Sequence, residues 1–204
     1  MKRVFALLVC SFLFLTVSAQ DSKLILGVEV AATRSTPWGN KNHFDPLYGL
    51  SPGFNLEYIL SPALSLKTGL CYERRGYRVD HIIGGPINDL TINNDYLLTP
   101  LLVSLSSKGV TRFYVSGGVF FGFLLSSTQV ITFYGDIDEE IRDDNENTSK
   151  YDFGLSFGCG VKQPIGSRII LDIGLRDNFG FDPENGWQYG YNTLGLVVSL
   201  KYRL

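Results

Sequence analysis

The densest group of potentially reactive side chains is acidic and lies between residues 136 and 146. Clustered carboxylates suit a hard cation such as calcium. The members are Asp136, Asp138, Glu139, Glu140, Asp143, Asp144 and Glu146. Their spacing does not match an EF-hand loop. A solvated surface loop is therefore the favoured interpretation, and calcium binding is the alternative.

Two histidines, each close to an aspartate, suggest acid–base catalysis. His43 stands two residues before Asp45, and His81 directly follows Asp80. An imidazole beside a carboxylate can move protons at neutral pH. The serines that could serve as a nucleophile are Ser35, Ser51 and Ser65. No nucleophile motif surrounds any of them, so we predict no catalytic residue, no cofactor and no metal site, with a lipid-modifying enzyme as the alternative.

Residues 151–176 show the pattern that positions these side chains. One face of the first arm carries Phe153, Leu155, Phe157, Cys159 and Val161, and the other carries Asp152, Gly154, Ser156, Gly158 and Gly160. A period of two indicates a β-strand with one apolar and one polar side. By the same parity Cys71 and Cys159 fall on opposite faces, so we expect no disulfide between them and no metal site.

The same alternation predicts eight strands along the chain. They cover residues 24–33, 52–60, 64–77, 96–105, 112–125, 151–161, 168–176 and 192–204. Pro100 cannot donate a hydrogen bond within its strand, so we expect a β-bulge there. The connections alternate between long and short, and the long ones cover 34–50, 78–94, 126–149 and 177–190. Short periplasmic turns and long outer loops are typical of outer-membrane barrels.

The two faces of these strands indicate an all-β fold, an eight-stranded antiparallel transmembrane up-and-down β-barrel. The apolar faces carry many large Leu, Ile and Phe side chains, whereas the polar faces are rich in Gly, which favours lipid outside and a narrow interior. Aromatic residues near strand ends could form the interfacial girdles. They are Tyr58, Tyr72, Phe113, Phe153 and Tyr202. The alternative is a soluble lipocalin-like ligand carrier with the faces reversed.

Charged residues of both signs lie on the predicted inner faces. They are Glu29, Glu57, Lys67, Glu73, Arg75, Arg112, Asp152, Asp172, Arg176, Lys201 and Arg203. An eight-stranded barrel has an interior just wide enough for side chains, and an unpaired buried charge is strongly unfavourable. We therefore expect these charges to pair and to plug the lumen. A polar ion pathway is the functional alternative.

The N-terminus has the features of an export signal. Lys2 and Arg3 precede an apolar run over residues 4–17, which ends in Val17-Ser18-Ala19. This predicts a cleaved signal peptide at 1–19 and a barrel domain at 20–204. Cleavage would change the net charge from -2 to -4. That mild charge, without a basic stripe, argues against a nucleic-acid partner.

Several segments resemble the PorT-like outer-membrane β-barrel family of bacteroidete bacteria. They are Val17-Ser-Ala-Gln20, Glu73-Arg-Arg-Gly-Tyr77, Tyr96-Leu-Leu-Thr-Pro-Leu-Leu102, Phe113-Tyr-Val-Ser-Gly-Gly118 and Asp152-Phe-Gly-Leu155. The segment from Tyr96 to Leu102 is the most specific. The resemblance implies an outer-membrane barrel, and one branch of that family takes part in protein secretion and gliding.

Together these patterns predict a non-enzymatic protein of the bacterial outer membrane, surrounded by its lipid. Its outer loops would bind a protein or glycan partner, or support a surface or secretion assembly. Exposed aromatic side chains in those loops are the expected anchors. They are Trp38, Phe44, Tyr48, Trp187 and Tyr189.

Overall fold

The computed structural model describes residues 23–38, 44–80, 87–133, 137–141, 148–181 and 190–204. The strands are β1 (Leu24–Trp38), β2 (Asp45–Ile59), β3 (Leu64–Asp80), β4 (Ile87–Ser106), β5 (Arg112–Phe133), β6 (Ile137–Ile141), β7 (Tyr151–Pro164), β8 (Ile169–Phe181) and β9 (Gly190–Arg203). No helix among these residues is long and apolar enough to cross a membrane.

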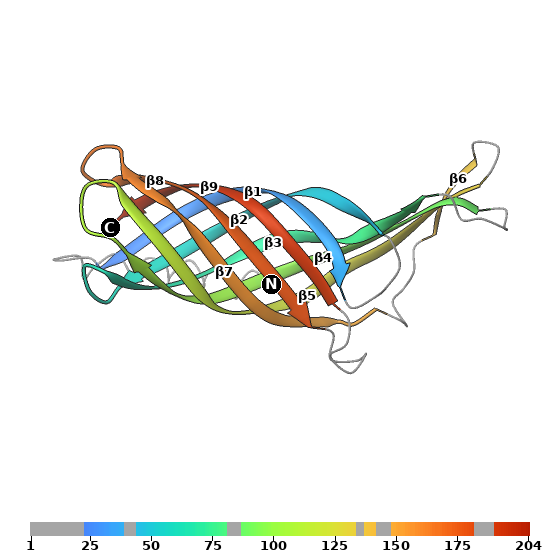
Figure 1. The fold of residues 1–204 in the computed structure, drawn as a ribbon, viewed down its shortest axis with the longest axis horizontal. Helices are drawn as coiled ribbons and strands as arrows, with labels where there is room; N and C mark the ends of the chain where they lie inside the picture. Colours follow the sequence, from blue (N-terminus) through green and yellow to red (C-terminus); the bar gives the residue numbers. More distant parts are fainter. Residues whose placement is uncertain (1–22, 39–43, 81–86, 134–136, 142–147, 182–189) are drawn as a thin grey trace, which may run out of the picture.

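Eight of the strands close into an antiparallel barrel. Each pairs with its neighbours along the chain, β1 pairs with β9, and β5 pairs with both β4 and β7. Figure 1 shows these strands tilted around a common axis. Full closure pairs the backbone of every barrel strand on both sides, as a lipid environment requires. The predicted fold class is therefore confirmed.

The short connections share one end of the barrel, where glycines permit tight turns. Gly109 lies between β4 and β5 with φ 121°, and Gly166 lies between β7 and β8 with φ 99°. A positive φ strongly favours glycine. Between β2 and β3 the Leu64 amide donates to the hydroxyl of Ser61, at 3.1 Å. The short-turn end of a barrel of this kind faces the periplasm.

The strands at the opposite, long-loop end extend further than the sequence pattern predicts. β4 has 20 residues and β5 has 22, whereas β8 has 13. About 9–11 residues suffice for a tilted membrane span. The excess of β4 and β5 forms an arm that projects beyond the barrel body, with β6 along its edge. Parts of the predicted loops 34–50, 78–94, 126–149 and 177–190 are therefore strand.

The register of β4 differs from the prediction at Pro100. Pro100 pairs with Phe120 in unbroken register, and the partners from Thr68 to Cys71 on β3 also keep one register. The predicted bulge is therefore wrong at this place. One irregularity lies instead where Asp95 pairs with Ser126 but Tyr96 pairs with Leu124, which leaves Leu125 as an extra residue. Such a bulge reverses which residues face inward beyond it.

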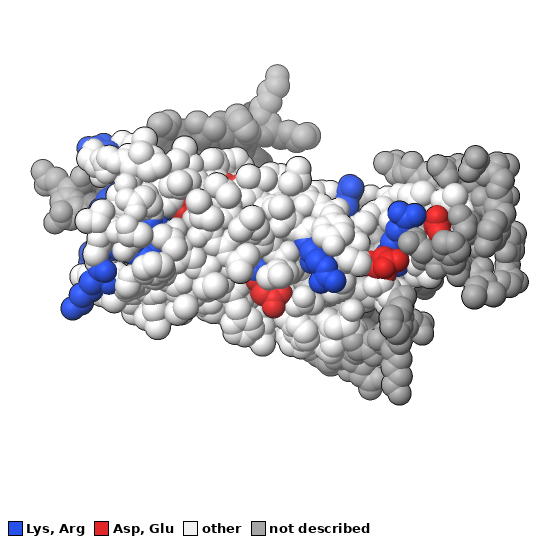
Figure 2. Space-filling model, turned by 45° about the horizontal axis from the view of Figure 1, so that its top comes forward, with Lys and Arg blue, Asp and Glu red and all other residues white. Residues whose placement is uncertain are grey.

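The outer surface of the barrel is apolar and the interior is polar. Exposed large side chains include Val28, Phe54, Leu101, Phe121, Phe157, Leu175 and Leu196. Buried polar side chains include Glu57, Glu73, Arg75, Asp152, Asp172 and Lys201. Figure 2 shows a largely uncharged band between charged ends. This arrangement is opposite to that of a soluble carrier, so the lipocalin-like alternative is wrong.

Candidate functional site

The barrel interior is the candidate site, because it brings together charged side chains from strands far apart in sequence. They form three levels between the long-loop end and the short-turn end. We name these the upper cluster (Glu73, Arg75, Asp152, Ser156 and Asn178), the middle pair (Glu29 and Arg176) and the lower cluster (Glu57, Lys162, Asp172 and Lys201).

The upper cluster is built around Arg75, whose side chain is fully buried. Its guanidinium lies 2.7 Å from Oε1 of Glu73, on the same strand, and pairs with Asp152 across the barrel. Asn178 donates to the second oxygen of Glu73 at 2.8 Å and accepts from Ser156 at 2.7 Å. Every oxygen of Glu73 is thus bonded, which is what a buried carboxylate requires.

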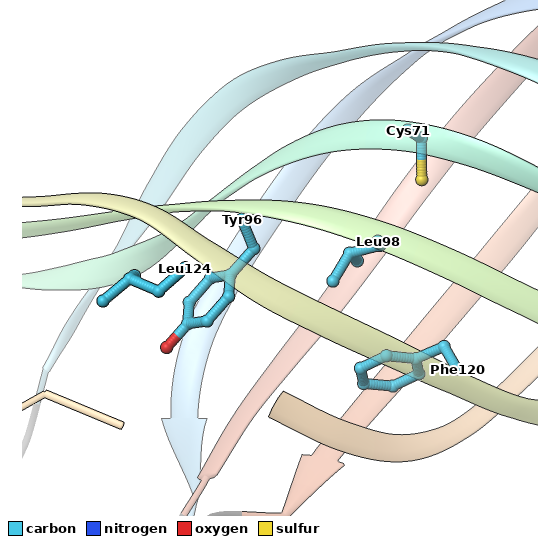
Figure 3. Packing of buried hydrophobic residues seen from close by; sticks show 5 residues of the cluster. All are labelled: Cys71, Tyr96, Leu98, Phe120 and Leu124. Atoms are coloured by element: carbon cyan, nitrogen blue, oxygen red, sulfur yellow. The ribbon is translucent and has the colours of Figure 1, made fainter. Parts of the chain in front are cut away.

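Aromatic and aliphatic side chains pack beside the upper cluster. Cys71, Tyr96, Leu98, Phe120 and Leu124 form the buried apolar cluster of β3, β4 and β5. The Arg75 guanidinium carbon lies 4.7 Å from the centre of the Phe120 ring, so a cation–π contact adds to the ion pairs. Figure 3 shows these side chains pointing into the barrel. This apolar part of the interior was not predicted, because strand β4 carries Leu on both faces.

A glycine makes room for the upper cluster. A Cβ on Gly180 would lie 2.8 Å from Nη1 of Arg75 and 2.9 Å from Oδ1 of Asp152. A similar relation holds lower in the barrel, where a Cβ on Gly174 would lie 2.5 Å from the Tyr114 hydroxyl. Glycine at these two positions therefore leaves space for larger side chains in the interior.

The middle pair joins β1 and β8, which are separated by β9 in the barrel wall. Arg176 donates to Glu29 at 2.6 Å, and Asn55 donates to the other Glu29 oxygen at 2.9 Å. Asn55 also lies 2.7 Å from the Ser199 hydroxyl. Cys71 is buried beside Arg176, whereas Cys159 is exposed on the outer surface. Both cysteines are free, so the expectation that they do not form a disulfide is confirmed.

The lower cluster alternates lysines and carboxylates. Lys201 donates to Asp172 at 2.6 Å and to Glu57 at 3.3 Å. Lys162 pairs with the other oxygen of Glu57, which also accepts from Ser65 at 2.7 Å. Lys162 was missed as an inner residue because it was assigned to a turn. Lys162 lies two residues after Gly160, and residues two apart in a strand share a face, so its side chain lies on the inner face.

Not every inner charge has an opposite partner. The Lys67 ammonium lies 3.5 Å from the centre of the Tyr114 ring and forms no ion pair with a described carboxylate. Arg112 and Arg203 lie at the short-turn mouth, and neither forms an ion pair within the described part of the chain. The expectation that inner charges pair is therefore confirmed for the three levels and wrong for these residues.

The structure places the candidate serines but describes neither of the two candidate histidines. His43, His81, Trp187 and Tyr189 lie outside the described residues, as do the side chains of the acidic stretch from Asp136 to Glu146. Ser35, Ser51 and Ser65 are buried in the interior. Among the described residues there is no group of His, Cys, Asp or Glu that could hold a metal.

The described aromatic candidates lie near the long-loop end. Trp38 stacks on Phe179, with ring centres 4.6 Å apart, and donates to the Gly180 carbonyl at 2.8 Å. Phe44 packs against Tyr77, with ring centres 4.4 Å apart. Tyr48 is 70% exposed. Of the predicted girdle residues, Tyr58, Phe113 and Tyr202 are exposed near the short turns.

Comparisons with known proteins agree with this architecture. The crystal structure of the outer membrane protein OprG from Pseudomonas aeruginosa matches with a TM-score of 0.54 and 12% identity, covering 90% of this chain and 97% of OprG. Neisserial surface protein A matches with a TM-score of 0.49 and 13% identity, and the match covers 90% of this chain and 98% of that protein. At these identities the likeness concerns the fold alone.

The sequence itself identifies the family. No curated protein matches the chain. A family model described as "Outer membrane protein beta-barrel domain" matches residues 19–184, which include every barrel strand except β9. An outer-membrane location follows from the family and agrees with the apolar outer surface. The chain belongs to this family of outer-membrane β-barrel domain proteins.

Proposed function

We propose that this protein is a non-enzymatic outer-membrane barrel with a plugged lumen, which acts through the strands and loops at its long-loop end. The barrel lumen and the long-loop end differ in how accessible they are to a partner. Ion pairs lie at three levels inside the barrel, whereas β4 and β5 continue well beyond the barrel body. A filled interior leaves the projecting end as the accessible surface for a partner.

Ion-pair geometry supports a plug rather than an ion pathway. The paired side chains of the three levels are at most 12% exposed. Two of the pairs reach across the barrel: Arg75 of β3 meets Asp152 of β7, and Lys162 of β7 meets Glu57 of β2. Opposite charges attract strongly where water is scarce, so these pairs hold the strands together across the lumen.

The placement of the candidate serines supports a non-enzymatic role. Ser35 and Ser51 are fully buried, and Ser65 donates its hydroxyl to Glu57. A nucleophile that attacks a membrane lipid must be reachable from the lipid or from the outer surface. These three hydroxyls face the filled interior instead. The role of His43 and His81 is proposed to be that of ordinary loop residues.

The partner at the long-loop end is proposed to be a protein or glycan of the cell surface. The exposed Tyr48 and the arm of β4 and β5 support this, because exposed aromatic side chains are frequent anchors in interfaces. The segment Tyr96–Leu102 supports a kinship with PorT-like barrels and hence with a secretion or surface assembly.

Site-specific photo-crosslinking in cells tests this proposal. A photoreactive amino acid would replace Tyr48 or Val130 at the long-loop end, and Val110 in a short turn as the matched control. We expect crosslinked adducts from the first two positions and none of the same mass from Val110. Adducts from Val110 alone, or none from either long-loop position, would contradict a partner at this end.

Export by a cleaved signal is proposed from the N-terminal pattern. Residues 1–19 carry two basic residues, an apolar run and a small-residue site ending at Ala19. N-terminal sequencing of protein extracted from outer membranes should begin at Gln20. Detection of Met1 in that fraction would show that the signal is retained.

A further inference from the structure

The short-turn end of the barrel, which faces the periplasm in barrels of this kind, contains a partly open cavity of about 270 Å³. Its walls are apolar and include Ile25, Ile59, Leu64 and Ile170. Its polar lining consists mainly of Arg112, Arg203, Lys162 and Glu57. A wider depression of about 610 Å³ shares Arg112 and Arg203 and adds Lys23. The cavity therefore has an apolar body and a strongly basic rim.

The described side chains leave this mouth with an excess of positive charge. Glu57 is the one carboxylate that lines the cavity, and Lys162 and Lys201 already share it. Lys23, Arg112 and Arg203 form no ion pair with a described carboxylate. Three cations thus surround an opening whose described side chains supply no further carboxylate, so the site favours an anionic ligand.

The hydrogen-bonding state of the two arginines indicates donors available to a ligand. Nε of Arg203 is buried and has no hydrogen-bond partner among the described residues. Nε of Arg112 donates to the Gly109 carbonyl at 3.3 Å, which holds the side chain while its Nη groups keep no described acceptor. A buried donor without an acceptor is unfavourable by itself, and an anion in the cavity would satisfy it.

We propose that this mouth is a binding site for a phosphate group, either the headgroup of a phospholipid or a free phosphate compound. Guanidinium groups bind phosphate oxygens with paired hydrogen bonds, and a phosphate monoester carries close to two negative charges at neutral pH. The isoleucine and leucine walls accommodate the carbon portion. Lys23 lies at the rim, where it adds to the attraction.

Isothermal titration of the purified, refolded protein with inorganic phosphate tests the free form, in a maltoside detergent that carries no phosphate. Native mass spectrometry of nanodiscs tests the lipid form, with phosphatidylglycerol compared against a neutral diacylglycerol. The double variant Arg112→Gln/Arg203→Gln should weaken binding at least about tenfold, because it removes the charged, paired donors that would hold the phosphate oxygens. Lys108→Gln, on the exposed adjacent turn, should leave it unchanged.

The two binding experiments distinguish between the two sources of phosphate. Binding of inorganic phosphate with no preference for phosphatidylglycerol assigns the site to a free compound, and the reverse assigns it to a headgroup. Heat-modifiable migration on gels reports folding of each variant. Arg112→Lys/Arg203→Lys, which keeps the charges and loses the paired donors, should bind with intermediate affinity. Absence of binding by both probes, or full binding by the folded Gln double variant, would overturn the proposal.

Discussion

The upper and lower clusters fill the same lumen in different ways. In the upper cluster a single arginine joins two carboxylates and packs against Phe120, within a region that also contains Leu98 and Tyr96. In the lower cluster, lysines share two carboxylates, while Lys67 rests on the Tyr114 ring. Cavities accompany the lower cluster, one of about 60 Å³ beside Lys67 and the mouth of about 270 Å³.

This difference follows from the side chains available at each level. The planar guanidinium of Arg75 offers several donors in fixed directions, so it can satisfy Glu73 and Asp152 together. A lysine ammonium is a compact charge on a flexible chain, and several are needed around Glu57 and Asp172. The upper level is dense and has two carboxylates for one arginine. The lower level is looser, and together with Lys67 it has three lysines for two carboxylates.

The largest expected effect is the loss of Arg75. Arg75→Ala leaves Glu73 and Asp152 buried without their cation, and removal of one partner from a buried ion pair lowers the free energy of unfolding by about 3–5 kcal/mol. Arg74→Ala is the matched control, since Arg74 is the next residue and forms an exposed pair with Asp95; about 1 kcal/mol or less is expected. Urea titration of both variants in liposomes measures the difference. Equal losses would show that Arg75 does not hold the upper level.

The aromatic part of the upper level provides the next test. Phe120→Ala removes a fully buried ring that contacts Arg75, and such truncations lower the free energy of unfolding by about 3 kcal/mol or more. Phe121→Ala removes the adjacent lipid-facing ring, which packs on Phe153 at 5.1 Å, and about 1 kcal/mol is expected. The same urea titration applies. A larger loss for Phe121 would mean that the faces of β5 are reversed.

Two lysines of the lower level should respond differently to the same replacement. Lys201→Met leaves Asp172 without its ion-pair partner and removes one partner of Glu57, so a loss of about 3 kcal/mol is expected. Lys67→Met replaces a buried cation that has only a ring contact, and should change stability by less than about 1 kcal/mol. Denaturant midpoints of the two variants decide this. A strong loss for Lys67→Met would reveal that its charge is needed.

The smallest perturbation is chemical labelling of the native cysteines. In liposomes a small membrane-soluble maleimide should label Cys159, which is exposed on the outer surface, and leave the buried Cys71 unlabelled. Both should react in urea, which provides the control. Mass spectrometry of the labelled peptides reads out the result. Preferential labelling of Cys71 in the folded barrel would indicate a register shifted by one residue.

The sequence predicted the strands, the closure and the facing of most side chains, because a period of two is directly visible in alternations such as Phe153 to Val161. It did not predict the partners of the inner charges. Parity assigns a face, but not the height at which two strands meet across the barrel. Lys162 and Glu57 are 105 residues apart, and nothing local connects them.

The remaining differences between the predicted and the observed structure have local physical causes. The extra residue at Leu125 reverses parity in β5, so Leu124 and Ser127 are both buried although their numbers differ in parity. Leu98 and Phe120 were not predicted as core because apolar residues occupy both faces of their strands. The extensions of β4 and β5 carry polar residues typical of loops, and their strand conformation comes from pairing with each other and with β3 and β6.

Conductance of the purified protein in planar lipid bilayers tests the plugged lumen most directly. An eight-stranded barrel filled at three levels by ion pairs should give no steady porin-like current, since an aqueous channel needs roughly 16–18 strands. We therefore expect no current through the bilayer at any applied voltage. Heat-modifiable migration of the recovered protein on gels verifies that it was correctly inserted. Large, stable and ohmic current steps from that protein would contradict the closed interior.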